Sequence, residues 1–222
     1  LENLSQEQYG AEEVLSDMIP YVQELSRDKD GNIKGLTWQS TPGGFWYRKD
    51  LAREYLGTDD PEELYSMMSD WDKIIEVGKE VWEKSDGKIA LLSDVEDILQ
   101  IYASYKGAPW VDENGHILSD DYQLEMYSLM DEVVKNHVDA EADMWSAGWT
   151  SGVYSNDMYI MTALPTWGLI HNIKPGIPTD EMDKAENLWG VMKAPIPYMN
   201  GGTWYAMYSG SKNKDAAWAW IK

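Results

Sequence analysis

The sequence contains no cysteine in its 222 residues. Disulfide bonds, thiolate metal sites and a cysteine nucleophile are therefore excluded. No apolar run approaches the roughly 18 to 20 residues that a membrane-spanning helix needs. The first ten residues, LENLSQEQYG, have neither the basic region nor the apolar region of a signal peptide, so none is recognised in this stretch.

Positive charge is scarce. The chain has 18 Lys and Arg against 39 Asp and Glu, which gives a formal net charge of −21. Proteins that bind nucleic acid depend on Lys and Arg to displace the counterions of the phosphates. The composition thus argues against nucleic acids and anionic membrane surfaces as partners, and it indicates a well-solvated acidic surface.

Phenylalanine is nearly absent, with one residue against 12 Trp and 14 Tyr. The indole N–H and the phenol O–H need partners when they are buried, so a dry core has no reason to prefer Trp and Tyr over Phe. The bias favours surfaces on which a ring meets water or a polar ligand, and sugars are ligands of this kind. Ordinary packing remains the alternative for most individual tryptophans.

Sequence motifs of catalysis are also missing. There is no G-x-S-x-G elbow, Walker A loop or dinucleotide fingerprint. None of the three histidines has the spacing of a metal ligand. Asp94, Glu96 and Asp97 cluster at a predicted helix start, where the helix dipole favours carboxylates and a chain this acidic gathers them by chance. We therefore predict no catalytic residue, no metal and no cofactor.

Predicted strands and helices alternate along the chain, which indicates the α/β class. Asp60-Pro61 and Ser69-Asp70 have the composition of helix starts, and Ser119 is the expected cap of another helix. Asn114-Gly115 is the expected turn of a hairpin. The Trp-rich residues near 145 and the segment from 175 to 187 are expected to be loops, and a strand ending at Pro165 leads into a turn that carries Trp167.

Two glycine pairs each stand just before a tryptophan. Gly43-Gly44 precedes Trp46, and Gly201-Gly202 precedes Trp204. Glycine lets a ligand approach the backbone closely, so a ring beside it suits a binding cleft. Two tight turns would explain the same pattern.

Five segments, taken in order, resemble the family 1 extracellular solute-binding proteins of bacterial ABC importers, which are sugar receptors similar to the maltose-binding protein. The resemblance begins near Asp28 and extends to the end of the sequence. The segments are GGFWYRKDLAREYLG, SDWDKIIEVGKEVWEKSDGKIAL, YKGAPWVDENGHILSD, NDMYIMTALPTW and LWGVMKAPIPYMNGGTWYAMYSGSKNKDAAWAWIK.

The resemblance implies an α/β fold of the periplasmic-binding-protein-like II type, with two lobes joined by a hinge. Residues 46–198 would be the second lobe. Residues 1–45 would be a fragment of the first lobe with the hinge crossing, and residues 199–222 its return strand and helix. On this interpretation the sequence is an excised part of a longer protein.

The resemblance also implies a ligand site. Trp167 matches the tryptophan that stacks on sugar in the relatives, and Thr41 falls where they place a polar contact. Asp94 and Glu96 lie near another polar contact. Cleft-lining residues expected from position, composition or location alone are Trp204, Gly202, Trp46, Trp145 and Trp149.

The implied function is that of a non-catalytic, monomeric component of an ABC importer, which captures a sugar or oligosaccharide and delivers it to a membrane permease. The protein would be extracellular, lipid-anchored at the cell surface or periplasmic. The alternatives are the same fold binding a peptide or polyamine, a fragment of a glycoside hydrolase, and a structural role on the cell surface.

Overall fold

A computed structural model describes residues 1–105, 110–118, 121–185 and 187–222. These residues form two compact units. Unit 1 combines Leu1–Ser40 with Gly201–Lys222, and unit 2 is the continuous segment Thr41–Asn200. The chain therefore passes between the units twice, once at residues 40–41 and once at residues 200–201.

The centre of unit 2 is a four-stranded sheet in the order β3-β4-β2-β5. Strand β4 runs parallel to β3, whereas β2 is antiparallel to both β4 and β5. Three strands thus point the same way, and their carboxyl ends meet the amino end of β2 at one edge, which we call the carboxyl-end edge. The strands are β2 (Gly43–Arg48), β3 (Ala90–Leu92), β4 (Tyr159–Pro165) and β5 (Trp189–Met192).

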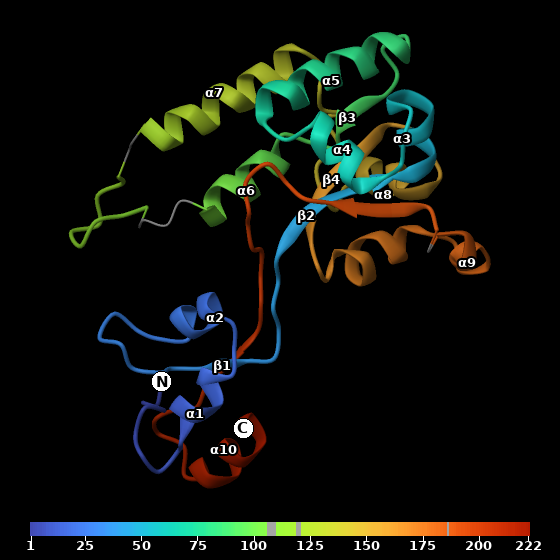
Figure 1. The fold of residues 1–222 in the computed structure, drawn as a ribbon. Coiled ribbons are helices and arrows are strands. Elements are labelled where there is room, and N and C mark those ends of the chain that lie inside the picture. The colour runs from blue at the N-terminus through green and yellow to red at the C-terminus, as the bar shows by residue number, and fades with distance from the viewer. Residues whose placement is uncertain (106–109, 119–120, 186) are drawn as a thin grey trace. The chain divides into compact units, whose positions relative to one another are not determined.

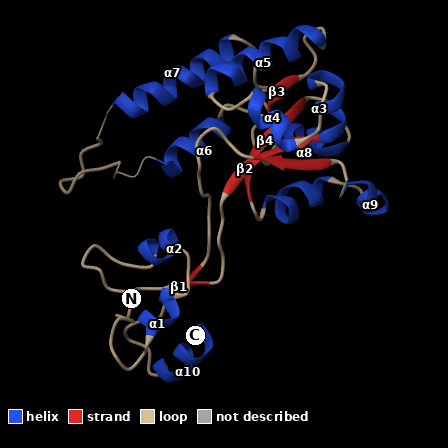
Figure 2. Ribbon diagram, viewed as in Figure 1, coloured by secondary structure: helices blue, strands red, loops and turns tan. Residues whose placement is uncertain are grey.

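Helices surround this sheet, which confirms the predicted α/β class (Figures 1 and 2). They are α3 (Lys49–Leu56), α4 (Pro61–Met67), α5 (Trp71–Lys84), α6 (Glu96–Tyr105), α7 (Asp121–Lys135), α8 (Ala147–Tyr154), a π-helix (Leu169–Ile173), two 3-10 turns (Lys174–Gly176 and Thr179–Glu181) and α9 (Met182–Ala185).

Local sequence explains several of these helix starts. The side chain of Asp60 accepts hydrogen bonds from the backbone N–H groups of Glu62 and Glu63, and Pro61 occupies the first turn of α4. Asp70 caps α5 in the same way through the N–H of Lys73.

The predicted hairpin is confirmed by an antiparallel bridge between Val111 and Ile117. Ser119, the predicted cap of α7, lies outside the described residues.

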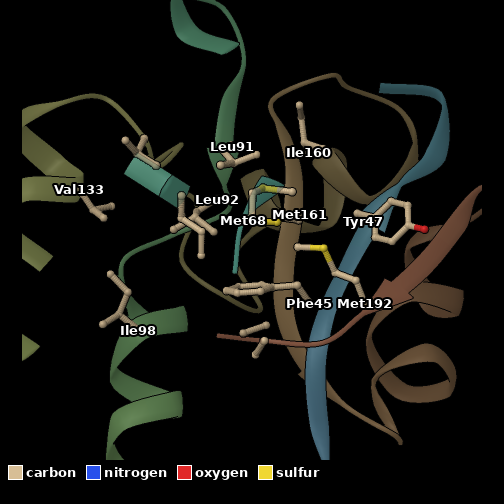
Figure 3. Packing of buried hydrophobic residues seen from close by; sticks show 14 of the residues in the cluster. Phe45, Tyr47, Met68, Leu91, Leu92, Ile98, Val133, Ile160, Met161 and Met192 are labelled. Carbon is tan, nitrogen blue, oxygen red and sulfur yellow. The ribbon is translucent and has the colours of Figure 1, made fainter. Parts of the chain in front are cut away.

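Alternation along β2 divides its side chains between two hydrophobic clusters. Phe45 and Tyr47 belong to the larger cluster, to which the helices from α3 to α7 contribute. Figure 3 shows Phe45 together with Met161 and Met192 in this cluster. Trp46 packs against the second cluster, which contains Trp149 of α8 and Ile173 of the π-helix. Because successive side chains of a strand point to opposite faces, both faces of the sheet are covered.

Two predicted loops contain helices instead. Residues 147–154 form α8, with Ser146 as its cap: Ser146 Oγ accepts a hydrogen bond from the N–H of Trp149. Gly148, Thr150 and Gly152 are weak helix formers, so the helix depends on burying Trp149 and Val153. The segment predicted as a loop from 175 to 187 includes α9 and 3-10 turns, which are too short to give a periodic sequence signal.

Unit 1 has a small core of its own. Two short strands pair antiparallel, β1 (Leu36–Thr37) and β6 (Trp204–Tyr205). Around them lie α1 (Ala11–Ser16), α2 (Pro20–Leu25) and α10 (Lys214–Ile221). Pro20 begins α2, as expected of a proline that cannot continue the preceding helix. Buried residues from both parts of the chain, among them Leu4 and Met207, form one cluster.

Candidate functional site

The carboxyl-end edge of unit 2 is the natural place for a ligand. In open α/β sheets, ligands bind outside the carboxyl ends of the strands, where the strand order changes direction. Here the chain continues from β3 into Ser93 and Asp94, and from β4 into Thr166 and Trp167. Thr41 lies just before β2 begins. Four of the predicted contact residues, Trp167, Thr41, Asp94 and Glu96, therefore belong to segments that start or end at this edge.

Trp167 lies in the turn between β4 and the π-helix. Its indole Nε1 donates a hydrogen bond of 3.0 Å to the carbonyl oxygen of Asn200. The ring lies 6.5 Å from the ring of His171, at an interplanar angle of 55°. The residue is half-buried. The ring is thus fixed through its polar atom while part of the residue stays accessible.

Asn200 is the residue that holds this part of the edge together. Its backbone N–H donates to the carbonyl oxygen of Thr41 at 3.2 Å, so the two segments that pass between the units are joined here. Its side-chain Nδ2 donates to Oε1 of Gln100 in α6 at 2.5 Å. Through Asn200, the backbone around Thr41, the ring of Trp167 and helix α6 are connected.

A second set of polar contacts is centred on the sulfur of Met144. Nε2 of Gln100 and Nδ2 of Asn172 both approach the sulfur of Met144, at 3.9 and 3.6 Å. Asn172 is only 3% exposed, and its Oδ1 has no hydrogen-bond partner among the residues that the structure describes. A buried amide oxygen without a donor is unfavourable, so Asn172 lowers the stability of this edge.

The predicted acidic contacts differ in their surroundings. Asp94 is buried, and its Oδ1 accepts a hydrogen bond of 2.8 Å from the N–H of Glu96 at the start of α6. Burial raises the pKa of Asp94, and the nearby carboxylates of Asp143 and Asp139 act in the same direction. Glu96 is exposed. Glu96 is therefore freely available to a ligand, whereas Asp94 is engaged in starting the helix.

Asp97 lies beneath the edge and is 1% exposed. Burial raises its pKa to about 8, although it accepts hydrogen bonds from the N–H of Ala163 and from the hydroxyls of Ser93 and Thr162. A carboxyl group that keeps its proton at neutral pH and is enclosed by strand residues has no access to a glycosidic bond. This geometry gives no support to the pair of accessible carboxylates that a glycosidase needs.

Thr41 and Trp46 lie on β2 or just before it. Thr41 is 3% exposed. Trp46 is half-buried, and its Nε1 donates to the carbonyl oxygen of Leu164 at 3.1 Å. Trp46 lines a groove of about 390 Å³ together with Gly44, Thr166 and residues of α4 and β5. Trp46 thus lines a groove together with residues of α4 and β5. Trp167 is not among the residues that line this groove.

Gly202 and Trp204 belong to unit 1. Gly202 has φ +115°, a conformation that disfavours every residue with a side chain, and an added Cβ would also meet the Trp204 ring at 2.6 Å. Trp204 pairs with Thr37 in the small sheet. Its Nε1 is buried without a hydrogen-bond partner among the described residues. The glycine therefore permits close packing of this indole.

The two tryptophans near residue 145 have opposite environments. Trp149 is 1% exposed and its Nε1 donates to Thr162 Oγ1 at 3.5 Å. The expectation that Trp149 lines the cleft is therefore wrong, because the ring is part of the core that anchors α8. Trp145 is 62% exposed and has φ +74°.

The polar residues Gln100, Asn172 and Asn200 were not predicted as contacts from the sequence. They come from three segments that are distant along the chain, and amides on helices carry no motif. One signal was present, since Asn200 directly precedes the glycine pair at the second passage between the units.

Comparison with protein families identifies the class. The model of a family described as bacterial extracellular solute-binding protein matches residues 1–222, the whole chain. The chain therefore belongs to this family of solute-binding proteins, and the resemblance found in the sequence is confirmed. Curated protein sequences give no significant match.

Solved structures show the same fold. A crystal structure of an extracellular solute-binding protein of family 1 has a TM-score of 0.79 at 19% identity, covering 99% of this chain and 55% of that one. The galacto-N-biose/lacto-N-biose I-binding protein of a Bifidobacterium longum ABC transporter gives 0.71 at 16% identity, covering 100% and 54%. The sugar-binding protein MalE of Xanthomonas citri gives 0.68 at 19% identity, covering 100% and 55%.

These neighbours confirm the predicted type II periplasmic-binding-protein fold. The chain spans little more than half the length of each of them. No helix among the described residues combines the length and the apolar character that crossing a membrane requires.

Proposed function

We propose that this chain is the sugar-binding part of an ABC importer, with unit 2 as the second lobe and unit 1 as part of the first. The sugar would lie against the carboxyl-end edge of unit 2. Ligand held between two lobes would stabilise the closed form, which a membrane permease then recognises. The protein would act as a monomer outside the cytoplasmic membrane, lipid-anchored or periplasmic, and would catalyse no reaction.

The observation that carries this proposal is the arrangement around Trp167. The indole N–H donates to the carbonyl oxygen of Asn200. This bond fixes the orientation of the ring and uses neither of its two faces. Sugars bind where an aromatic face meets their C–H groups and fixed polar atoms meet their hydroxyls. Amides from Gln100 and Asn172 lie in the same network of contacts. Solved neighbours include proteins in complex with maltose, lacto-N-biose and β-1,6-galactobiose, which supports a sugar as the ligand.

A cationic ligand is the alternative that the charge favours. The carboxylates of Asp143, Asp139 and Glu96 all act on Asp94 near the start of α6. However, burial raises the pKa of both Asp94 and Asp139. Asp94 is only 6% exposed and Asp139 only 7%, so both carboxylates offer little surface to a polyamine.

The test is a titration of the full-length protein, followed by tryptophan fluorescence and calorimetry. The panel consists of glucose, galactose, maltose, lacto-N-biose, β-1,6-galactobiose and the cation spermidine. We expect at least one sugar to bind and spermidine not to bind. Binding of spermidine with no response to any sugar would replace the proposal by the cationic alternative.

Variants of Trp167 locate the site. Trp167→Ala removes the stacking face and should weaken sugar binding about tenfold. Trp167→Phe keeps a ring but loses the bond to Asn200, so its loss should be smaller. Tyr127→Ala is the matched control, because Tyr127 is an exposed aromatic residue on α7. Unchanged affinity in Trp167→Ala would refute this assignment.

Delivery to a permease needs a cellular measurement. Deleting the gene should abolish uptake of the bound sugar at low external concentration, and the wild-type gene should restore it. Trp167→Ala should restore uptake only at higher sugar concentration. Undiminished uptake after deletion would contradict the transport role while leaving the binding result intact.

A further inference from the structure

Asp97 is a carboxyl group that the fold encloses in the first turn of α6. It accepts a hydrogen bond of 2.9 Å from the backbone N–H of Ala163 in β4. The neighbouring strand β3 ends at Leu92, which lies opposite Met161, so the N–H of Ala163 lies beyond the end of β3 and needs another acceptor. The carboxyl of Asp97 therefore joins the start of α6 to the sheet.

Two hydroxyl groups complete a closed triangle with this carboxyl. Ser93 Oγ lies 3.1 Å from Oδ2 of Asp97 and 2.9 Å from Oγ1 of Thr162. Thr162 Oγ1 lies 3.3 Å from Oδ1 of Asp97. Each of these three contacts needs one hydrogen between its two oxygens, because lone pairs that face each other repel. We call the three contacts together the Asp97 cycle.

The hydrogens available to the Asp97 cycle can be counted. Ser93 and Thr162 supply one hydroxyl hydrogen each, which fills two of the three contacts. The indole N–H of Trp149 donates to Thr162 Oγ1 at 3.5 Å from outside the cycle and fills none of them. The third hydrogen is therefore the proton of Asp97 itself. In one arrangement that fills every contact, Asp97 Oδ2 donates to Ser93, Ser93 donates to Thr162, and Thr162 donates to Asp97 Oδ1.

The surroundings of Asp97 favour the same protonated state. Burial and the nearby carboxylate of Asp94 raise the pKa of Asp97 to about 8. Two phenols also interact with it, Tyr159 of β4 and Tyr198 in the segment after β5. Burial and the charge of Asp97 raise the pKa of both phenols, so they stay neutral while Asp97 titrates. Asp97 is thus a buried group that changes its charge in mildly alkaline solution.

Helix α6 connects Asp97 with the candidate site. Gln100 lies three residues after Asp97, on the same side of the helix. Oε1 of Gln100 accepts the hydrogen bond from Asn200 Nδ2, and the carbonyl oxygen of Asn200 accepts the indole N–H of Trp167. All four residues belong to unit 2. A change at Asp97 is therefore transmitted along one turn of helix to the residues that orient Trp167.

We propose that Asp97 is a pH switch for ligand binding at the carboxyl-end edge. With its proton, the Asp97 cycle is closed and fixes the first turn of α6 against the sheet. Without it, one contact lacks a hydrogen and a charge is buried, both of which are unfavourable, so α6 loosens and Gln100 no longer supports Asn200. The effect on the ligand rests on the proposed function: sugar affinity should fall in alkaline solution.

Carbon-13 NMR of the aspartate carboxyl groups tests the proton directly. In the full-length protein, the Asp97 resonance is assigned by its absence from the spectrum of Asp97→Asn. It should titrate near pH 8 and not near the ordinary pKa of 3.8. Titration near the ordinary value would overturn the Asp97 cycle. A bound sugar should raise the pKa of Asp97 further, because coupling between two binding events is reciprocal.

Sugar titrations at pH 6, 7, 8 and 9 test the coupling. For the sugar of the panel that binds most tightly, wild-type affinity should fall several-fold between pH 7 and 9, and at most about tenfold per pH unit. Asp97→Asn keeps the cycle, because an amide N–H can replace the carboxyl O–H, and it has no proton to lose. The affinity of Asp97→Asn should therefore change much less over the same range.

Asp94→Asn is the matched control, since it removes a neighbouring carboxyl group and leaves the Asp97 cycle in place. It should keep the alkaline loss of sugar affinity. The loss should move to lower pH, because the negative charge of Asp94 favours the protonated form of Asp97. An equally flat pH profile in Asp94→Asn and Asp97→Asn would contradict the assignment to Asp97.

Two failures are distinguishable. If no sugar binds the wild-type protein at any pH, the proposed function fails and the coupling fails with it, whereas the Asp97 cycle is decided by the NMR titration alone. If a sugar binds with the same pH dependence in the wild type and in Asp97→Asn, only the switch is overturned.

Discussion

The larger hydrophobic cluster of unit 2 and the carboxyl-end edge of the same unit differ in the polarity and the burial of their residues. In the cluster, Phe45, Ile74 and Leu91 are completely buried. At the edge, Asn172 is buried with an unpartnered oxygen, and Trp145 is exposed on a left-handed backbone. The cluster contributes stability through burial, whereas the edge retains features that reduce stability. The difference indicates that the cluster supplies the free energy of folding, whereas the edge, where we propose that the sugar binds, keeps groups that reduce it.

The largest effect is expected in the cluster. Phe45→Ala removes a fully buried ring and should lower the free energy of unfolding by about 3–5 kcal/mol, measured by urea denaturation. Sugar affinity of the folded protein should stay close to that of the wild type, because Phe45 faces the cluster. A larger loss of sugar affinity than of stability would show that the cluster and the edge do not have separate roles.

Asp97 lies between the two regions and should make stability depend on pH. The unfolded chain loses this proton near the ordinary pKa of 3.8, whereas the folded protein keeps it until about pH 8. The stabilising contribution is thus complete below about pH 4 and decreases as the pH rises toward 8. The slope is at most ~1.4 kcal/mol per pH unit.

The measurement is urea unfolding of the wild type and Asp97→Asn at several pH values between 4 and 8. The difference in unfolding free energy between the two proteins should change steadily across this window in the predicted direction. A constant difference would show that Asp97 titrates in the folded protein as it does in the unfolded chain.

A variant of Asn200 tests whether the hydrogen-bonded residues at the edge stabilise the protein together. Asn200→Ala deletes the bond to Gln100 and leaves the backbone bonds to Thr41 and Trp167, so it should cost about 1 kcal/mol of stability. Combined with Gln100→Ala, the two losses should not add, since either variant removes the same bond. Strictly additive losses in denaturation experiments would exclude this coupling.

The smallest change in stability is expected for a surface ion pair of unit 1. Nη2 of Arg27 lies 2.7 Å from Oε2 of Glu12, and the two side chains are 31% and 57% exposed. Glu12→Gln should therefore lower stability by only ~0.2–1 kcal/mol, and less at high salt. An effect as large as that of Asn200→Ala would mean that exposed charges matter more here than the polar network of the edge.

Local sequence predicted much of the scaffold. Asp60 and Pro61 mark the start of α4, and Asp70 marks the start of α5, because caps and prolines act within one turn. The sequence missed α8, since Gly148, Thr150 and Gly152 disfavour a helix that only the burial of Trp149 stabilises. Short-range signals thus identified elements that they stabilise, and failed where tertiary packing decides.

The candidate site was predicted less completely. Trp167 was predicted as a ligand contact through the family resemblance, and the structure adds that its indole N–H donates to the carbonyl oxygen of Asn200. Composition could not separate Trp145 from Trp149, because tryptophan suits both a core and a wet surface. The amides of Gln100, Asn172 and Asn200 meet only after folding, so no spacing in the sequence reveals them.

One bond described above has a practical consequence. Unit 2 begins at Thr41 and ends at Asn200, and those two terminal residues are hydrogen-bonded to each other. An uninterrupted segment whose ends already touch is suited to excision, to transplantation into a loop of another protein, and to circularisation by a short peptide link. Residues 41–200 are therefore a suitable segment for expression and study apart from unit 1.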